Sequence, residues 1–549
     1  MPTLENAPRR RFAARGVCVR PVPVFPPPSL PMMPIFSRKA AYSLPAVLLS
    51  AGFLILTVAA PLWAMLRYED GALLWREVLS DGYYRQRLQW TAFQAACTAL
   101  LTLLLGLPAG WTLARFEFRG RRLLLRLLML PFVLPTLVAG MGVLALFGEH
   151  GLLWRGLTDT PWLLLYGNVF FNLPVAVRSV YQGLRQVPAD RTAAVRTLGA
   201  TPWQCFWLAE WPVLKPWLAG AACLVFLYCF SGFGLALLLG GERYATAEVE
   251  IYRLIAYELD MARAAVLVWS VLGTTALAGA ACAWFARRST AAAVRVMQPE
   301  KPATAAQRLF LAASLAPLVF CCALPVSAVL FQAASAGGAW RVLWEDDTLA
   351  ALWNTLRFSA CTVAAAAVLG MANTVAARRL GALRALLFLP LMVSPVCLAF
   401  GVLLLYPDWS ATLPMLLALY ALTAYPPVAK DLLAARDSLP PDYAAAARVS
   451  GATPFQAACR VTLPLLRPAL RRSLPFAAAA GIGEFAATLF LSRPEWTTLT
   501  TLVYRYLGRV GAENRHKAAV LTLLLAALAA AVFALLDDAD DTAENDKAA

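Results

Sequence analysis

The sequence predicts an all-α integral membrane protein with about 12 transmembrane helices, arranged as two homologous six-helix halves. Three observations support this prediction: an apolar composition, apolar blocks long enough to cross a bilayer, and a pattern that occurs twice. Of the 549 residues, 60% are hydrophobic and 15% are charged, and the mean hydropathy is +0.63. Soluble proteins have roughly 45–50% apolar and about 25% charged residues, so the composition excludes an ordinary soluble domain.

The net charge of +16 does not indicate a nucleic-acid-binding protein, because no basic stretch carries the interleaved aromatic residues of such a surface. We attribute the positive charge to cytoplasmic loops. The 11 cysteines lie mostly inside apolar segments without a C-x-x-C pair, so we expect buried thiols. His150 and His516 lie in predicted loops and offer no metal cluster, and the sequence implies no cofactor.

The predicted organisation begins with a basic, Pro-rich tail over 1–43, which we expect to be disordered and cytoplasmic. It contains no apolar core of a signal peptide, and Met32 and Met33 offer alternative starting points. The first half occupies 44–286, a polar linker 287–308, the second half 309–536, and an acidic cytoplasmic tail 537–549.

Twelve apolar segments are candidates for the spans. They run over about 44–66, 91–115, 123–147, 161–181, 213–240, 262–286, 309–333, 354–379, 384–406, 411–429, 466–491 and 517–536. The segment 411–429 is the weakest of them. Prolines such as Pro131 and Pro135 do not argue against a helix here, because neighbouring helices can satisfy the freed backbone groups.

The charges of the loops predict the orientation. With the amino terminus inside, the five cytoplasmic loops and the span ends beside them carry 25 Lys and Arg against 7 Asp and Glu, whereas the six external loops and their span ends carry 15 against 17. Because basic loops stay in the cytoplasm, we expect a multi-pass membrane protein with both termini cytoplasmic.

The repeat extends over both halves. Ala96-Cys97-Thr98 with Gly106 matches Ala360-Cys361-Thr362 with Gly370 at one offset. Six helices in the same order and orientation predict a pseudo-two-fold axis along the membrane normal, with a pathway between the halves.

Two matched cytoplasmic loops are the strongest local feature. Residues 188–216 read PADRTAAVRTLGATPWQCFWLAEWPVLKP, and residues 440–468 read PPDYAAAARVSGATPFQAACRVTLPLLRP. The pattern predicts a short helix, a stop at Gly199 or Gly451, and a second helical piece entering the next span. A short surface helix of this kind suits docking into a partner's groove. A polar loop without a special role is the alternative for a single copy, but two matched copies favour docking.

These loops resemble the EAA loop of ABC-importer permeases, which forms a coupling helix seated on a cytoplasmic ATPase. The resemblance assigns the ATPase-coupling positions to Pro188, Ala193, Ala194, Gly199 and Pro212, and to Pro440, Ala445, Ala446, Gly451 and Pro464. Ala193 and Ala445 stand where the motif has Glu. This departure puts in doubt the polar contact that the Glu would make.

Within the fused twelve-helix permeases, the chain is similar to the thiamine (and thiamine pyrophosphate) importer permeases. The similarity is carried by FFNLP at 170–174 with Arg178, AEWP at 209–212, DMARAA at 260–265 and IGEF at 482–485. Fused iron(III) permeases share much of this layout, so iron(III) is the main alternative cargo, with polyamine or sulfate behind it.

The resemblance implies the partners and the fold of a type I importer, and a location in the bacterial inner (cytoplasmic) membrane. Two copies of a cytoplasmic ABC ATPase would grip the two loops, and a periplasmic substrate-binding protein would deliver cargo for alternating access. Membrane lipid surrounds the chain, and nucleic acid is not an expected partner. The sequence has no G-x-x-x-x-G-K-[ST] motif, so the chain is not itself an ATPase of the P-loop type and is predicted to be a transporter subunit rather than an enzyme.

Glu484 is the one acidic residue that we place inside a span, where a charge is costly unless it serves a function or has a partner. Its repeat mate is Gly232. One hypothesis is a substrate-pathway role toward the thiamine cation. The alternatives are that Glu484 caps a broken helix, pairs with an arginine, or lies nearer the membrane interface.

Two other classes of membrane protein remain as alternatives. An ion-driven secondary transporter needs several intramembrane carboxylates or histidines for coupling, and it gives no reason for the matched loops. A membrane-embedded enzyme needs a cluster of catalytic polar groups at one depth, and the sequence suggests none.

Overall fold

The computed structural model describes residues 44–68, 72–286, 299–377, 390, 393–440, 442–491 and 493–537. Within these residues every extended regular element is helical, and the one β contact is an isolated bridge between Phe116 and Glu300. The predicted tails and most of the predicted linker, 287–298, lie outside the described residues.

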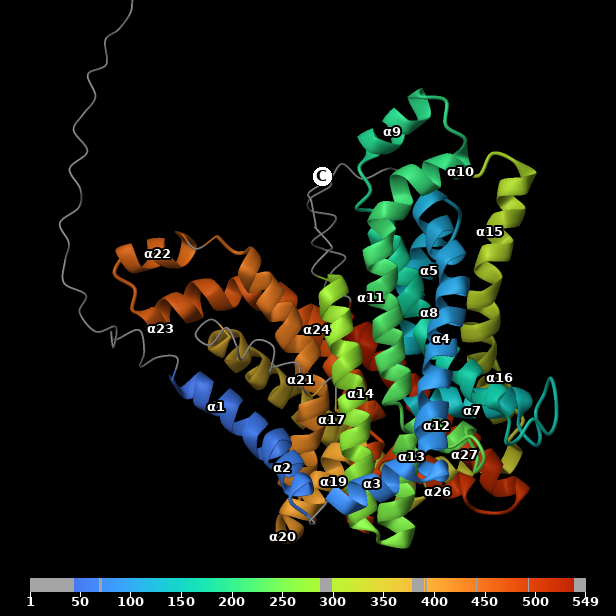
Figure 1. The fold of residues 1–549 in the computed structure, drawn as a ribbon, viewed down its shortest axis with the longest axis vertical. Helices are drawn as coiled ribbons and strands as arrows, with labels where there is room; N and C mark the ends of the chain where they lie inside the picture. The colour runs from blue at the N-terminus through green and yellow to red at the C-terminus, as the bar shows by residue number, and fades with distance from the viewer. Residues whose placement is uncertain are drawn as a thin grey trace, which may run out of the picture. The chain divides into compact units, whose positions relative to one another are not determined.

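The first half carries α1–α14 in chain order (Figure 1). Its helices are α1 (Leu44–Leu54), α2 (Ala60–Leu66), α3 (Ala72–Ser80), α4 (Gly82–Arg115), α5 (Arg121–Leu127), α6 (Leu130–Val133), α7 (Thr136–Phe147), α8 (Pro161–Leu184), α9 (Ala189–Thr197), α10 (Pro202–Cys205), α11 (Trp211–Phe230), α12 (Gly234–Leu239), α13 (Ala247–Arg253) and α14 (Met261–Ala286). Five-residue π-helical turns continue the chain at Ile55–Ala59, Phe206–Glu210 and Leu254–Glu258.

The second half repeats much of this order. Its helices are α15 (Ala305–Leu318), α16 (Leu324–Ala334), α17 (Asp346–Ala376), α19 (Pro395–Leu405), α20 (Pro407–Ser410), α21 (Leu413–Ser438), α22 (Asp442–Val449), α23 (Pro454–Ala457), α24 (Leu463–Gly483), α25 (Ala486–Leu491), α26 (Leu499–Leu507) and α27 (Ala512–Asp537). Its π-helical turns are Val319–Ala323 and Ala458–Thr462, and 3₁₀ turns occupy Gly337–Trp344 and Pro494–Trp496.

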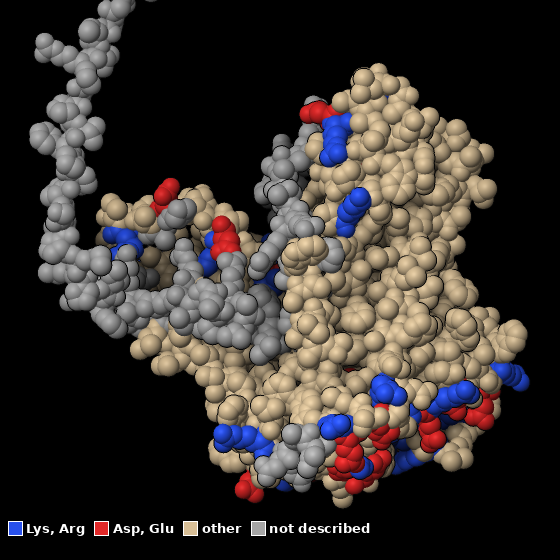
Figure 2. All heavy atoms as spheres, viewed as in Figure 1, with Lys and Arg blue, Asp and Glu red and all other residues tan. Residues whose placement is uncertain are grey.

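The described residues contain nine helices that are long and apolar enough to cross a membrane, and each overlaps a different predicted span. Figure 2 shows charged side chains gathered mainly at the end of the molecule around α3 and α13, with a broad uncharged region beside it on the face drawn. An uncharged band of this kind is what a bilayer requires of a lipid-facing surface. The chain is therefore a multi-pass membrane protein.

Three predicted spans differ from the expectation. Segment 123–147 is a pair of helices bent by 98° rather than one straight span. The bend follows from Pro135, because the residue before a proline avoids the helical region, and Leu134 is extended with ψ 139°. Segment 384–406 falls partly outside the described residues, and segment 411–429 belongs to α21, a helix less apolar than the nine.

The two halves exchange their first helices. The α1–α2 helix packs against α17 and α19 of the second half, and α16 packs against α7 of the first half. A Cβ at Gly142 would lie 2.7 Å from the Pro325 carbonyl oxygen, and one at Gly401 would lie 2.7 Å from Pro61 Cβ. Glycine at both crossings allows this close approach.

Hydrogen bonds lock both exchanged helices at their π-helical turns. Tyr406 Oη donates to the carbonyl oxygen of Leu56 over 3.2 Å, and Tyr166 Oη donates to that of Phe320 over 2.5 Å. Leu56 and Phe320 occupy corresponding positions of the repeat. Because a π turn shifts the helical hydrogen-bond register, its carbonyls can accept a partner from outside the helix.

Candidate functional site

The two loops predicted to couple to an ATPase are called coupling segments here, and the first consists of α9, a glycine turn and α10. Pro188 is the N-cap of α9, and Gly199 ends it with φ +82°. The Gly199 N–H donates to the Arg196 carbonyl over 2.9 Å, and the Ala200 N–H donates to the Val195 carbonyl over 3.4 Å. This pair of bonds is a Schellman turn, which requires a left-handed residue at the glycine position.

The second coupling segment has the same construction. Gly451 has φ +87°, its N–H donates to Arg448 over 3.1 Å, and the Ala452 N–H donates to Ala447 over 3.0 Å. In both segments a Thr and a Gln then cap the next helix reciprocally: Thr201 with Gln204, and Thr453 with Gln456. Both π turns that follow, Phe206–Glu210 and Ala458–Thr462, also correspond.

An exposed aromatic side chain projects from the same position of each coupling segment. Trp203 is 68% exposed and its repeat mate Phe455 is 69% exposed. Ala193, Ala194, Ala445 and Ala446 are exposed as well. Each segment therefore presents small residues on its helix and one large aromatic anchor beside it, a surface suited to a partner's groove.

A carboxylate missed by the sequence analysis holds the first coupling segment. Glu210 is buried, accepts a hydrogen bond from Trp111 Nε1 over 2.9 Å and forms an ion pair with Arg115, both on α4. Its repeat mate is Thr462. The AEWP run contains this carboxylate, but the sequence pattern predicts a loop there. Glu210 lies in the first turns of the helix Pro202–Phe230, which is long and apolar enough to cross a membrane.

Glu484 lies in the break between α24 and α25. It follows the end of α24, is 8% exposed, and accepts hydrogen bonds from the Ala487 N–H over 3.0 Å and from Thr423 Oγ1 over 3.4 Å. The carboxylate thus caps the first turn of α25, as the capping alternative expected. Gly232 lies in the corresponding break between α11 and α12.

Four aromatic side chains adjoin these breaks and come from corresponding positions. Phe233 stacks on its own repeat mate Phe485, with ring centroids 6.1 Å apart. Tyr252 packs edge-on against Phe233 at 5.5 Å, and its mate Tyr504 packs edge-on against Phe485 at 5.3 Å. A residue that contacts its own mate lies on the two-fold axis, so this aromatic quartet marks the pseudo-axis between the halves. The repeat offset could have identified it.

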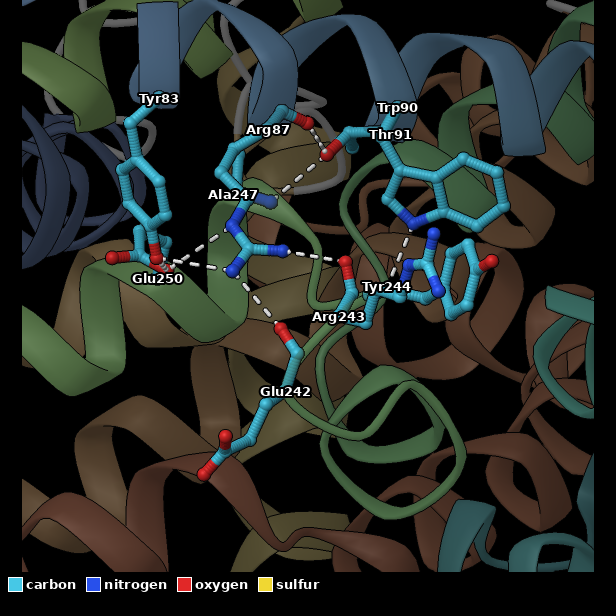
Figure 3. A network of polar contacts seen from close by, with 9 residues as sticks. All are labelled: Tyr83, Arg87, Trp90, Thr91, Glu242, Arg243, Tyr244, Ala247 and Glu250. Atoms are coloured by element: carbon cyan, nitrogen blue, oxygen red, sulfur yellow. Dashed lines mark hydrogen bonds and ion pairs between the residues drawn. The ribbon is translucent and has the colours of Figure 1, made fainter. Parts of the chain in front are cut away.

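Two matching sets of hydrogen bonds, called brackets here, fix α13 and α26, the helices that carry Tyr252 and Tyr504. Thr91 Oγ1 accepts from the Ala247 N–H over 2.9 Å, and its mate Thr355 Oγ1 accepts from the Leu499 N–H over 2.9 Å. Figure 3 shows the first bracket, in which Arg87 donates to the carbonyl oxygens of Glu242 and Arg243. These bonds tie α13 to α4, and the matching bond ties α26 to α17.

The charged parts of the brackets do not repeat. In the first half Tyr83 Oη donates to Glu250 Oε2 over 3.0 Å (Figure 3). In the second half Glu345, just before α17, accepts from Lys517 Nζ and from Tyr506 Oη, each over 2.8 Å. The hydrogen bond from Lys517 holds the pKa of the Glu345 carboxyl below its ordinary value.

A cavity of about 730 Å³ opens between the two halves beside the coupling segments. The last turns of α8 and α21, which lead into α9 and α22, line it together with parts of α5, α24 and α27. Four arginines and one aspartate face it: Arg126, Arg178, Arg185, Arg472 and Asp431. Both coupling segments therefore emerge next to one shared cavity.

The model of the family described as the binding-protein-dependent transport system inner membrane component matches residues 103–291 and 363–539. The chain belongs to this family. Each match includes one coupling segment and one member of each aromatic pair, so the family unit occurs twice in one chain. Members are transport components of the membrane and not enzymes.

Three curated relatives illustrate the similarity. The thiamine transport system permease protein ThiP of Haemophilus influenzae is 27% identical over 518 residues, covering 86% of this chain and 92% of that protein. ThiP of Escherichia coli K12 is 28% identical over 513 residues, covering 87% and 93%. The sulfate transport system permease protein CysW of Synechocystis is 29% identical over 207 residues, covering 36% of this chain and 74% of that protein.

Proposed function

We propose that this chain is the membrane-spanning permease of an ATP-driven importer for thiamine or its phosphates. The observation that carries the proposal is similarity along nearly the whole chain to permeases named for thiamine transport. The sulfate permease aligns over 207 residues, about a third of this chain, whereas the thiamine permeases align over both halves.

The two coupling segments serve two copies of one ATPase subunit. Their support is the repeated geometry: the same glycine turn, the same reciprocal cap and an aromatic anchor of equal exposure at Trp203 and Phe455. Identical partners require equivalent docking surfaces. Because Ala193 and Ala445 lack the motif's carboxylate, backbone shape and the aromatic anchors carry more of the contact.

The passage for cargo follows the pseudo-axis through the aromatic quartet. Stacked rings of Phe233 and Phe485 close it, and their separation exposes ring faces and brings Glu484 to the passage. Thiamine carries an aromatic cation, and such cations bind aromatic faces and carboxylates. Capping α25 and facing cargo are compatible roles for Glu484, because a carboxylate has two oxygens and about four acceptor sites.

The transport cycle is alternating access with residues 44–286 and 309–536 as its two halves. A periplasmic binding protein delivers cargo to the face opposite the coupling segments, and both termini lie in the cytoplasm. ATP-driven closure of the ATPases moves α9 and α22 together. Since these helices continue α8 and α21, the cavity between the halves closes as the aromatic quartet opens.

Uptake in a bacterium that lacks its own thiamine importer tests the proposal. The chain is expressed with a thiamine-type binding protein and ATPase, and labelled thiamine uptake is compared with iron(III) uptake. We expect thiamine uptake that disappears when the ATPase carries an inactivating substitution. Uptake of iron(III) without thiamine would overturn the cargo assignment.

A further inference from the structure

The arginine cavity between α8 and α21 has a charge that transport of the unphosphorylated thiamine cation does not explain. Its four arginines and one aspartate give it a net charge of +3. A cationic cargo leaving by this route would be repelled. Arg178 and Arg472 form no ion pair within 4 Å with any part of the chain that the structure describes. The cavity therefore calls for an anionic occupant.

The chain carries a matching anion next to the cavity. Phe533 of α27 lines the cavity, and α27 ends at Asp537. Four residues along a helix cover only about 6 Å. Residues 538–549 follow directly with the sequence DADDTAENDKAA, which contains five acidic residues and one lysine. This acidic segment lies outside the described residues.

We propose that the acidic segment, 538–549, docks in the arginine cavity of the same chain. Its net charge of −4 offsets the cavity's +3, and arginine forks bind carboxylates in paired hydrogen bonds. Twelve residues reach at most about 40 Å when extended, and the segment starts beside the cavity wall. A short tether gives an effective concentration in the millimolar range, so a weak contact suffices.

Docking places the segment between walls that belong to both halves. Arg178 lies on α8 and Arg185 directly follows it, whereas Arg472 comes from α24. The cavity cannot close while the acidic segment is bound between these walls. The acidic segment therefore occupies the cavity only while the coupling segments are apart, and it neutralises the charge that a cation meets there.

Thiol labelling of the full chain in lipid nanodiscs tests this proposal. Ser438 lines the cavity and is exposed, so Ser438→Cys supplies a reporter, with Ala434→Cys as a second. The native Cys459, exposed on the second coupling segment, is the internal reference. Site-resolved mass spectrometry measures labelling by a neutral and by a sulfonated methanethiosulfonate. The comparison chain has the five acids of 538–549 changed to amides.

We expect the amide chain to label at the reporter on the order of tenfold faster with both reagents, while Cys459 is unchanged; loss of a charged contact has about this effect. Arg472→Gln should release the segment similarly, whereas Arg471→Gln, its neighbour outside the cavity lining, should not. Equal neutral-reagent rates in the two chains would overturn the proposal. The proposal would also be overturned if inorganic diphosphate slowed labelling of the reporter cysteine equally in the parent chain and in the amide chain. The cavity would then be a site for small anions.

Discussion

Replacing Gly451 by leucine tests whether the glycine turn of the second coupling segment transmits ATP-driven movement. Gly451 has φ +87°, a conformation that costs an L-residue roughly 1–2 kcal/mol. A Cβ added there meets nothing within 4 Å, so no steric term adds to the strain. This cost lowers the population of the observed turn, relative to other backbone conformations after α22, by a factor of about 5–30.

The expected result is loss of coupling without unfolding. In proteoliposomes containing the ATPase and binding protein, Gly451→Leu should lower thiamine uptake per ATP hydrolysed by roughly fivefold or more. Its unfolding temperature should stay close to that of the parent, because the strain is local and small. Gly451→Ala should behave like the leucine variant, whereas Gly451→Asn should stay near the parent, since asparagine tolerates this conformation.

A control variant separates coupling from strain. Gly337 also has positive φ, +53°, with open space around its Cβ position, but lies in the turn before α17 rather than in a coupling segment. Gly337→Leu should therefore leave coupling intact. Unchanged uptake per ATP in Gly451→Leu would refute the coupling assignment. Equal damage from asparagine and leucine would show that side-chain volume, not backbone conformation, matters there.

Three further predictions concern single carboxylates. Glu484→Gln keeps an acceptor for the Ala487 N–H but removes the charge. Thiamine uptake should therefore fall about tenfold, the effect of roughly 1.4 kcal/mol, while ATP coupling stays intact. An unchanged uptake rate would exclude a pathway role for Glu484. Glu210→Ala breaks a buried ion pair, at a cost of about 3 kcal/mol, so it should lower both the unfolding temperature and the coupling of ATP hydrolysis to uptake. Thr462→Ala, at the corresponding position of the repeat, should lower neither. Similar losses in both variants would contradict the role of Glu210 in anchoring the first coupling segment. Glu345 has a pKa below its ordinary value of 4.5, so its contribution to stability is full above that value and is lost as pH falls through the lower folded pKa. The difference in unfolding temperature between parent and Glu345→Gln should be constant from pH 7 to about 5 and shrink in more acidic buffer, and a constant difference throughout would contradict the hydrogen bond's role.

The coupling segments were predictable because their information is local. Gly199 and Gly451 stop helices rich in alanine, and Thr201 with Gln204 forms a cap whose residue types and spacing are readable in sequence. The Ala193 and Ala445 departures were also visible. The π turns after each cap have no comparable signal, since their sequences, FWLAE and ACRVT, share no residue type at any matching position.

Features that depend on distant contacts were not predictable from single segments. The exchange of first helices rests on crossings such as Gly142 with Pro325, which are 183 positions apart in the sequence. Glu210 looked like a loop residue until α4 supplied Trp111 and Arg115. The bend in segment 123–147 was within reach, because Pro135 restrains Leu134, but proline was accepted there as part of a membrane helix.

The repeat preserves backbone shape and aromatic contacts while charges diverge. Phe233 and Tyr252 have aromatic residues at the corresponding positions of the repeat, whereas Glu210 corresponds to Thr462 and Glu484 corresponds to Gly232. In the proposed function, two identical ATPases dock equivalently on the two halves, which accounts for the likeness of the halves at α9 and α22. A small asymmetric cargo on the axis cannot contact both halves in the same way, so one carboxylate on one half is enough for it. On this reasoning, moving the charge from Glu484 to position 232, by Gly232→Glu with Glu484→Gly, should restore part of the uptake that Glu484→Gly alone loses. No recovery would show that the capping contact to α25 outweighs the charge.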